Sequence, residues 1–273
     1  MAKRALLVGI NAYPKPNDLN GCLNDLDNMA AYLKTKHGFA DADIQQIRDK
    51  QATTANIVKA LEGLAASLKS GDQAVFHYSG HGAQMPTKTK GEVDGLDEVI
   101  CPVDFDWSDE HAIRDDDFNR IFSGIPAGVE LVWVSDSCHS GNLERAEWPR
   151  GIVAKARRIL PPKAIQAEIN EARKAGKAKV RALTAPSKLN VALISGCRSA
   201  QTSADAEIDS RFNGAATYYL LKALRQDPGA PLDDLVKAVD KALASAGYSQ
   251  QPGTFGSHAI RGRAFLALEA VPV

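Results

Sequence analysis

The stretch Gln73-Ala-Val-Phe-His-Tyr-Ser-Gly-His-Gly82 decides the fold, because an apolar run of strand length leads directly into small residues around a histidine. The stretch Val129-Glu-Leu-Val-Trp-Val-Ser-Asp-Ser-Cys-His-Ser-Gly141 repeats this arrangement with a cysteine. Apolar runs of roughly four to eight residues bounded by turn residues indicate buried strands. In an open parallel sheet, ligands bind beyond the carboxyl ends of the strands. We therefore expect His81 and Cys138 to lie together just past two strand ends.

Strands and helices alternate along the rest of the chain. Besides 73–79 and 129–135, apolar runs predict strands at 5–10, 43–49, 191–195 and 264–268. Apolar residues at helical spacing predict helices that begin near Cys22 and Ile57, and two more over 214–225 and 232–244. This alternation is typical of an α/β fold with a mainly parallel central sheet and helices on both faces.

The charge of the chain is balanced overall but segregated locally. Its 273 residues include 33 basic and 33 acidic side chains, so no global field favours nucleic acid or an anionic membrane as partner. Residues 142–190 hold twelve Lys or Arg against four Asp or Glu, together with several prolines. We interpret this segment as a mobile basic linker that contains some helix.

The amino-terminal residues and the cysteines indicate a reducing compartment. The first ten residues contain only a short apolar run, too brief for a secretory or membrane segment, and predict a cytoplasmic location. The four cysteines are far apart and show no paired spacing of a zinc site or redox couple. We therefore expect reduced thiols.

Cys138 and His81 suit a nucleophile and its base. A thiol attacks as thiolate, and at neutral pH a neighbouring imidazole takes its proton and later protonates the leaving amine. Small residues flank both side chains and leave room for a substrate backbone. His139 is a competing base, but adjacent side chains usually point apart, so we assign it a structural role. The other thiols, at 22, 101 and 197, lack this setting and are expected to be inert.

Several further motifs accompany these two. They are Tyr78-Ser-Gly-His-Gly82, Asp136-Ser-Cys-His-Ser-Gly141, Leu6-Leu-Val-Gly-Ile10 followed by Leu19-Asn-Gly-Cys-Leu-Asn-Asp-Leu26, Asp94-Gly-Leu-Asp-Glu-Val-Ile-Cys-Pro-Val-Asp104, Ile194-Ser-Gly-Cys197 and Gln201-Thr-Ser-Ala204. With them the chain resembles the metacaspases and their prokaryotic relatives, the orthocaspases, in the caspase clan of cysteine peptidases. The interval from 81 to 138 is similar to the about 50 residues that separate histidine and cysteine in caspases.

The resemblance implies a caspase-like α/β/α sandwich that forms one domain. Its parts would be a large catalytic part at 1–141, a basic linker at 142–190 and a small part at 191–273. It also implies a cysteine endopeptidase with a dyad of His81 and Cys138, in which the backbone N–H groups of Gly82 and Cys138 stabilise the oxyanion. Metacaspases generally act as monomers on protein or peptide substrates, and we expect the same here.

The resemblance further implies cleavage after Arg or Lys, because metacaspases have an acidic first pocket. Asp136 and Asp25 match the acids of that pocket, and Ser79 and Cys22 would line it. A carboxylate pairs with guanidinium in bidentate fashion, which favours Arg over Lys. A further acid of the family is replaced here by Arg198. The alternative is that Asp136 merely ends a strand and Asp25 lies on a solvated helix face.

Three acids resemble the family's calcium ligands, namely Asp97, Asp115 and Asp116. Calcium prefers several carboxylate and carbonyl oxygens, so the resemblance implies that calcium activates the enzyme, although the thiol chemistry itself requires no cofactor. Near the place of the family's fourth acid the chain has Glu144 followed by Arg145. The alternative is that residues 115–117 cap the N–H groups of a helix that begins there.

A peptidase that cuts after basic residues would find targets in its own linker. We therefore predict self-processing, with a solvated and partly helical surface insert as the alternative. The candidate positions are Arg150, Arg157, Arg158, Arg173, Lys174 and Lys188.

Two other functions are compatible with these residues. One is an inactive protease fold that serves as a binding or signalling module. The other is an esterase or transpeptidase that uses the same thiol and imidazole, although an acidic pocket does not favour it.

Overall fold

A six-stranded sheet forms the centre of the molecule. The computed structural model describes residues 1–87, 95–138, 148, 152–175, 191–198 and 201–267. The strand order is β12-β9-β7-β3-β1-β2, and every neighbouring pair is parallel except β12 with β9. The strands are β1 (Lys3–Gly9), β2 (Ile44–Arg48), β3 (Gln73–Ser79), β7 (Glu130–Asp136), β9 (Val191–Ser195) and β12 (Gly253–Phe255). The predicted mainly parallel sheet is confirmed.

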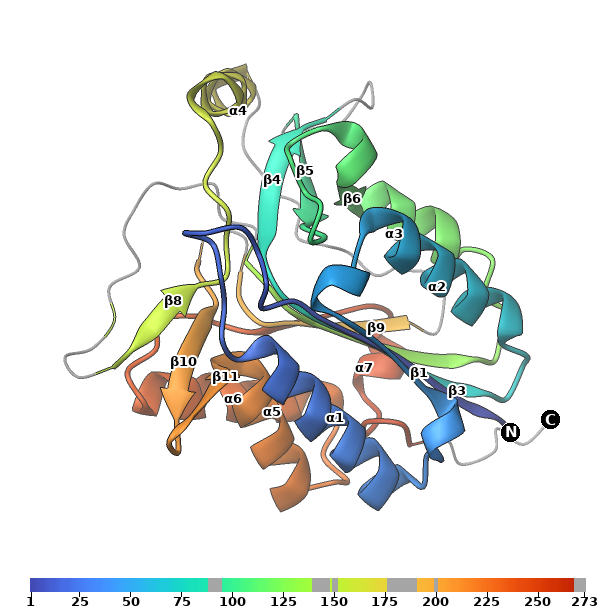
Figure 1. Ribbon diagram of the computed structural model, residues 1–273. Helices are drawn as coiled ribbons and strands as arrows, with labels where there is room; N and C mark the ends of the chain where they lie inside the picture. Colours follow the sequence, from blue (N-terminus) through green and yellow to red (C-terminus); the bar gives the residue numbers. More distant parts are fainter. Residues whose placement is uncertain (88–94, 139–147, 149–151, 176–190, 199–200, 268–273) are drawn as a thin grey trace.

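Helices cover both faces of this sheet, so the molecule has three layers (Figure 1). On one face lie α1 (Cys22–His37), α5 (Ala215–Gln226), α6 (Leu232–Ser245) and the short α7 (His258–Arg261). On the other lie α2 (Thr54–Ser67) and α3 (Asp115–Phe122). The arrangement confirms the expected α/β/α sandwich. None of the described helices combines the length and apolar character needed to cross a bilayer.

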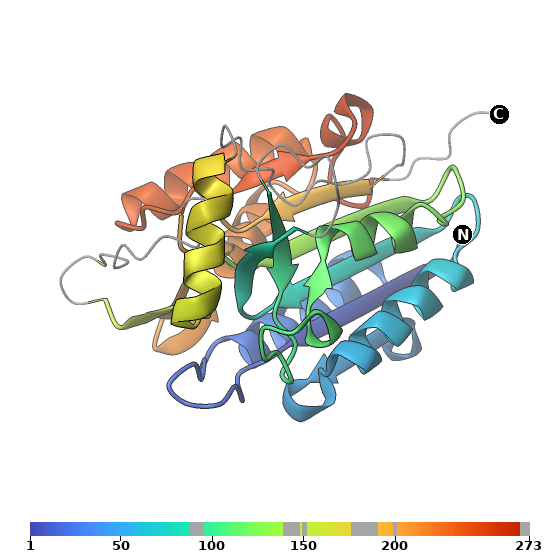
Figure 2. The ribbon, with the colours of Figure 1, turned by 90° about the horizontal axis from the view of Figure 1, so that it is seen from above.

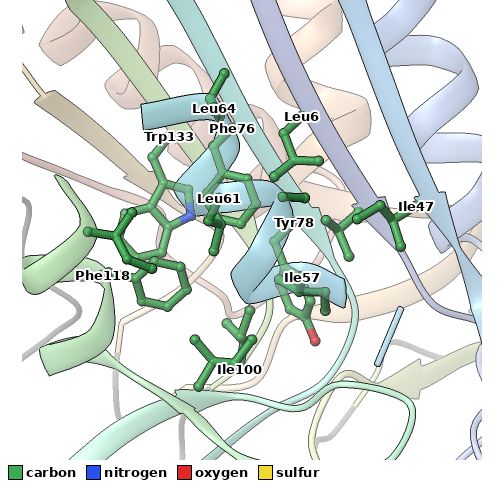
Figure 3. Close-up of a cluster of buried hydrophobic side chains, with 14 of the residues drawn as sticks. Leu6, Ile47, Ile57, Leu61, Leu64, Phe76, Tyr78, Ile100, Phe118 and Trp133 are labelled. Carbon is green, nitrogen blue, oxygen red and sulfur yellow. The ribbon is translucent and has the colours of Figure 1, made fainter. Parts of the chain in front are cut away.

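Two apolar clusters hold the sheet between its helices. In the cluster under α2 and α3, Trp133 of β7 packs on Phe118 with ring centroids 4.3 Å apart and on Phe76 of β3 at 5.7 Å (Figure 3). The second cluster lies between the sheet and α1, α5 and α6. Full burial of each such side chain contributes about 1.5–3 kcal/mol, so β3 and β7 form a rigid base for the loops at their ends.

Two small antiparallel sheets flank the carboxyl ends of the central strands. The first consists of β4 (Gly82–Pro86), β5 (Leu96–Ile100) and β6 (Ile113–Arg114), and α4 (Lys163–Ala175) packs against β4 and β5 (Figure 2). The second consists of β8 (Ala154–Ala156), β10 (Ala204–Ile208) and β11 (Arg211–Gly214). Because β4 begins directly after the turn that follows β3, the first sheet borders the position of His81.

The predicted elements agree with the structure except near the carboxyl terminus. The strand predicted at 264–268 is wrong over its described residues, where Phe265 and Leu266 are buried in a turn and Leu266 has a φ of 52°. An apolar run there reflects burial of a loop, and the last strand of the sheet is β12 instead. Within 142–190, α4 confirms the predicted helix, whereas β8 is an element that the sequence pattern does not predict.

Candidate active site

The two strand ends that carry the predicted nucleophile and base are neighbours. Strands β3 and β7 are paired in parallel with Ser79 opposite Asp136. His81 and Cys138 each follow two residues later, and therefore leave the sheet at equivalent positions of adjacent strands. Adjacent strands lie roughly 4.8 Å apart, so the register alone brings the thiol and the imidazole to one edge of the sheet.

His81 is buried and held from two sides. Its Nε2 lies 2.6 Å from the Asn17 carbonyl oxygen, and its backbone N–H donates to the Tyr13 hydroxyl over 3.0 Å. Because a carbonyl can only accept, Nε2 carries the proton and Nδ1 keeps its lone pair. Burial lowers the pKa of His81 to about 4, while the Asn17 carbonyl acts in the opposite direction. The imidazole is therefore neutral at pH 7 and able to accept a proton.

Cys138 is fully buried, and its thiol contacts the backbone of a distant loop. The S–H group donates to the Gln201 carbonyl over 2.7 Å. The thiol of Cys197 also lies near the Gln201 carbonyl, at 3.6 Å, and the neighbouring Cys138 together with burial raises the pKa of Cys197.

A carbonyl of the linker lies where the resemblance implies oxyanion donors. The backbone N–H groups of Gly82 and Cys138 both donate to the carbonyl oxygen of Arg157, each over 3.2 Å. Two converging backbone donors are the arrangement that stabilises the negative charge of a tetrahedral intermediate. The Arg157 carbonyl is therefore polarised by both donors and lies beside the buried imidazole.

The side chain of Arg157 fills a buried acidic pocket. Its Nη2 donates to Asp25 Oδ2 over 2.8 Å and to Asp205 Oδ1 over 3.1 Å. Its Nη1 donates to Ser79 Oγ over 2.7 Å and to the backbone carbonyl of Asp136 over 3.1 Å. The carboxylate of Asp136 lies farther away, 3.5 Å from Nη1. No part of this guanidinium is exposed, so it is a ligand of the pocket and not a surface charge.

Hydrogen bonds from the fold keep the pocket carboxylates in place. Asp136 accepts from the backbone N–H and hydroxyl of Thr217, both over 2.8 Å, and from the Ser203 hydroxyl over 2.6 Å. Asp25 accepts from the backbone N–H of Gly214 over 2.9 Å. A Cβ at residue 214 would overlap both the Asp136 carboxylate and the Arg157 guanidinium, so glycine is needed there. The carboxylates are thus oriented by groups other than the arginine.

The electrostatics of the pocket depend on the bound guanidinium. Burial raises the pKa of Asp25 to about 7, Arg157 opposes this increase, and Asp136 adds to it. Asp205 is also buried and accepts from the backbone N–H groups of residues 20 and 21, over 2.7 and 2.8 Å. Three neighbouring carboxylates without a cation would repel one another at low dielectric. The pocket is consequently complementary to a single positive charge.

Ser79 and Cys22, the two residues expected to line the pocket, lie at it in different ways. Ser79 donates its hydroxyl proton to Asp25 Oδ2 over 2.7 Å and accepts from Arg157, so it connects carboxylate and guanidinium. Cys22 is fully buried in the core cluster at the start of α1, and burial raises the pKa of its thiol while the nearby guanidinium of Arg157 lowers it.

The linker runs through the site in extended form on both sides of Arg157. Residues 154–156 pair antiparallel with 204–206 of β10, and the backbone N–H of Arg157 donates to the Ser203 carbonyl over 3.0 Å. Beyond Arg157, residue 158 bridges to Gly82, and Ile159 N donates to the Gly82 carbonyl over 3.4 Å. Peptides that bind by strand addition gain affinity from such main-chain hydrogen bonds.

Of the six candidate cleavage positions, the described structure brings Arg157 into the pocket. Arg158 follows it directly. Arg173 and Lys174 lie on α4, where Arg173 donates to Gln84 over 2.8 Å and Lys174 pairs with a glutamate one turn away. The remaining two candidates, at 150 and 188, lie outside the described residues, as does the competing base at 139.

The residues expected to bind calcium are engaged elsewhere. The carboxylate of Asp97 forms a buried ion pair with Arg114, which also binds Asp109. Asp115 begins α3 and accepts from the backbone N–H of Asp116 over 3.1 Å. The described part of the chain contains no group of three His, Cys, Asp or Glu residues that could hold a metal ion. These residues do not fit a calcium site, because an arginine already neutralises the most buried carboxylate.

The alternative of helix capping fits this segment better. Asp117 Oδ2 accepts from the backbone N–H of Arg114 over 3.0 Å, which satisfies a donor at the start of α3. Glu144 and Arg145, near the expected fourth ligand, lie outside the described residues.

Sequence reasoning missed the third acid of the pocket. The sequence did not identify the residue that forms the far wall of the pocket, because Arg198 stands where the family has an acid. In the structure, Arg198 is exposed. Asp205 supplies the missing carboxylate and directly follows the motif Gln201-Thr-Ser-Ala204. The motif thus led up to this residue, but only the contact between Asp205 Oδ1 and Arg157 Nη2 in the structure shows that Asp205 faces the arginine.

Comparisons with known proteins agree with this architecture. Residues 3–145 match the family described as metacaspase, peptidase C14 domain. Metacaspase-1A of Aspergillus terreus is 32% identical, over 94% of this chain and 70% of its own length. Protein GSU0716 of Geobacter sulfurreducens is a solved structure with a TM-score of 0.68 and 28% identity, covering 97% of this chain and 98% of its own. Caspase-1 of Spodoptera frugiperda, 13% identical with a TM-score of 0.59 over 98% of this chain and 91% of its own, shares the fold.

The fold is caspase-like, and the matching family makes the protein a cysteine peptidase, a hydrolase that acts on proteins. Within that class, the chain belongs to the metacaspase family.

Proposed function

We propose that this metacaspase is an endopeptidase that cleaves after Arg, and that it processes its own linker at the Arg157–Arg158 bond. The observation that carries the proposal is the position of Arg157. Its guanidinium lies among three carboxylates, and its carbonyl accepts from two backbone N–H groups at the nucleophile and the base. The linker thus resembles a bound substrate on both sides of one peptide bond.

The chemistry begins with a proton transfer. The Cys138 thiol turns away from the Gln201 carbonyl and gives its proton to Nδ1 of the neutral His81. The thiolate then attacks the carbonyl carbon of Arg157. Negative charge that develops on the carbonyl oxygen is stabilised by the N–H groups of Gly82 and Cys138, which already point at it.

Breakdown of the tetrahedral intermediate needs an acid. His81, now protonated, donates its proton to the backbone nitrogen of Arg158, which leaves as a free amine, and an acyl-enzyme remains on the sulfur. His81 next removes a proton from water, which attacks the thioester and releases the carboxylate of Arg157. Thiol, imidazole and backbone N–H groups suffice for these steps, so they need no cofactor.

The same pocket supports a preference for Arg in other proteins. Two carboxylates and a hydroxyl bind separate nitrogens of the guanidinium, a pattern that the single nitrogen of Lys reproduces only in part. An Asp side chain would add a fourth negative charge to the pocket. All the groups invoked come from one chain, so a monomer is sufficient for catalysis.

Self-processing is tested on the purified full chain. Wild type is expected to give fragments that end at residue 157 and begin at residue 158, as measured by mass spectrometry of intact fragments over time. Cys138→Ala and His81→Ala should remain uncut. Arg157→Ala should abolish this cut, and Arg157→Lys should slow it. Arg150→Ala and Lys188→Ala are matched controls, because each removes one basic residue from another candidate position of the linker.

Two results would refute the proposal. One is the appearance of the same fragments from Cys138→Ala, and the other is unchanged cutting after residue 157 in Arg157→Ala. Turnover of fluorogenic peptides that end in Arg, Lys or Asp then measures specificity in trans. A Cys138-dependent preference for Arg supports the proposal, whereas ester turnover without peptide turnover would favour the esterase alternative, and no turnover of either would favour a binding module.

A further inference from the structure

Strand β8 and the residue that follows it present two basic side chains, Lys155 and Arg157, to acidic groups. Side chains alternate along a strand, so Lys155 and Arg157 lie on the same side of the linker. On the other side, Ile152 and Ala154 pack against the apolar cluster that includes α5 and α6. The segment 152–157 therefore has an apolar face and a basic face. Of its two facing basic side chains, Arg157 fills the acidic pocket, and the contacts of Lys155 have not yet been described.

Lys155 contacts a single residue of the loop between β1 and α1. Its Nζ lies 2.8 Å from the carbonyl oxygen of Asp18 and 2.9 Å from Asp18 Oδ2. Two oxygens of one residue thus converge on the ammonium group. The pair is partly open to solvent, with side-chain exposures of 38% for Lys155 and 35% for Asp18, so it is shallower than the pocket of Arg157.

The loop that carries Asp18 is part of the site and not a free surface segment. The preceding residue, Asn17, accepts from the His81 imidazole, and the N–H groups of Asn20 and Gly21 donate to the Asp205 carboxylate. Asp18 is therefore held between two contacts to the site. Asp205, which lies opposite Lys155 in the strand pairing, directs its carboxylate to Arg157, so Asp18 is the acid that contacts Lys155.

We infer that Asp18 forms a second specificity pocket, which selects Lys or Arg at the third residue before the cleaved bond. The inference rests on the proposed function, because it takes residues 154–157 as a model of a bound substrate. The preferred substrate would carry two basic residues separated by one residue, as in Ala154-Lys-Ala-Arg157. Sequences with an acidic residue at the third position would be disfavoured by the negative charge of Asp18.

Three fluorogenic peptides test this pocket in self-processed wild type: Ala-Lys-Ala-Arg, Ala-Ala-Ala-Arg and Ala-Glu-Ala-Arg. We expect kcat/KM to be about two- to fivefold higher for the Lys peptide than for the Ala peptide, as for a partly exposed ion pair. The Glu peptide should be about tenfold worse than the Lys peptide, because like charges meet. The differences should shrink when salt is added.

Asp18→Asn should turn over the Lys and Ala peptides equally well, and Asp18→Lys should prefer the Glu peptide to the Lys peptide. Asp41→Asn is the matched control, since it removes an exposed acid remote from the linker and should keep the wild-type order. In the full chain, Lys155→Glu should slow self-cleavage and Lys155→Arg should not.

The outcomes separate the two proposals. If Arg peptides are turned over at one rate whatever their third residue, or if Asp18→Asn keeps the Lys preference, the pocket is refuted while cleavage after Arg stands. If wild type turns over no Arg peptide, the proposed function fails and this inference fails with it. The wild-type peptide series decides the matter even if an Asp18 variant does not fold.

Discussion

Two groups of acidic side chains in this molecule bind an arginine, and they differ in where that arginine comes from. In the pocket, Asp25 and its neighbours bind Arg157, which lies 132 residues away in the chain from Asp25 and arrives on a separate strand. In the other group, Asp97 binds Arg114, only 17 residues away and on the strand next to its own. The resemblance to metacaspases assigns function to both groups.

The comparison shows how a ligand site differs from a structural ion pair. Arg114 belongs to the same small sheet as Asp97, so the strand pairing keeps its backbone beside that carboxylate in the folded protein. Arg157 belongs to a linker that, under the proposed function, is cut directly after this residue, and the cut would free the pocket for the arginine of another protein. The pocket carboxylates have their own hydrogen bonds from Thr217 and Gly214, which keep them oriented once the arginine leaves.

The largest expected effect comes from the pocket itself. Asp25→Asn should lower kcat/KM for an Arg peptide by about a thousandfold, because it removes the carboxylate nearest to a fully buried guanidinium. Asp27→Asn, on the same helix but exposed, should leave kcat/KM within about twofold. Steady-state kinetics on both variants, with thermal unfolding to verify folding, make the measurement. An Asp25→Asn enzyme as active as wild type would remove the pocket from the mechanism.

A second, smaller effect concerns the base. In uncut Cys138→Ala protein the docked linker keeps His81 buried, so its pKa should be about 4, as followed by NMR of the imidazole protons. Adding Arg157→Ala should undock the linker, admit water and raise this pKa towards its ordinary value, by about two pH units. His81→Asn assigns the signal against His77, which is also buried and whose pKa is also about 4.

The lowered pKa of His81 also determines how the stability of the fold changes with pH. A histidine whose pKa is lowered by folding binds its proton more readily in the unfolded state, so stability should be lost as pH falls from about 6.5 to about 4. This loss should be smaller in the protein with the added Arg157→Ala change. An identical pKa of His81 in both proteins would contradict the view that the linker shields the base.

The smallest effect is expected at the structural ion pair. Arg114→Ala in the Cys138→Ala protein should lower the free energy of unfolding by about 2 kcal/mol, because it leaves the buried Asp97 without its cation. In the active protein, the same change should leave the preference for Arg over Asp peptides unaltered. Arg120→Ala, which removes a half-exposed pair with Glu62, should cost about 0.5 kcal/mol or less in urea unfolding. A change of specificity in Arg114→Ala would assign that group to the site after all.

Most of the fold could be predicted from local patterns. Strands such as Val191–Ser195 are continuous apolar runs, and α5 and α6 show clear helical spacing. Each of these elements can therefore be predicted from its own residues alone. The error at 264–268 arises because a buried turn is as apolar as a strand. Strand β8 escapes prediction because three residues are too few to show a period.

The candidate site was predictable in part for the same reason. His81 and Cys138 follow recognisable strands, and the parallel pairing of those strands is enough to bring them to one edge. The pocket is different, because its acids come from a helix, a strand end and a small antiparallel sheet that lie far apart in the chain. Asp205 directly follows the motif Gln201-Thr-Ser-Ala204, but nothing in the local sequence indicates that its carboxylate faces the arginine.

What the sequence determined by itself is the alternation of elements and the placement of thiol and imidazole, since both depend on neighbouring residues and on the geometry of a parallel sheet. Only the tertiary structure decided that Arg157 is the linker residue that enters the pocket, and that Asp205 and Asp18 face the linker. These choices depend on the register of β8 against β10, a contact between distant segments that local composition does not specify. A shift of one residue would turn Lys155 and Arg157 away from their acids.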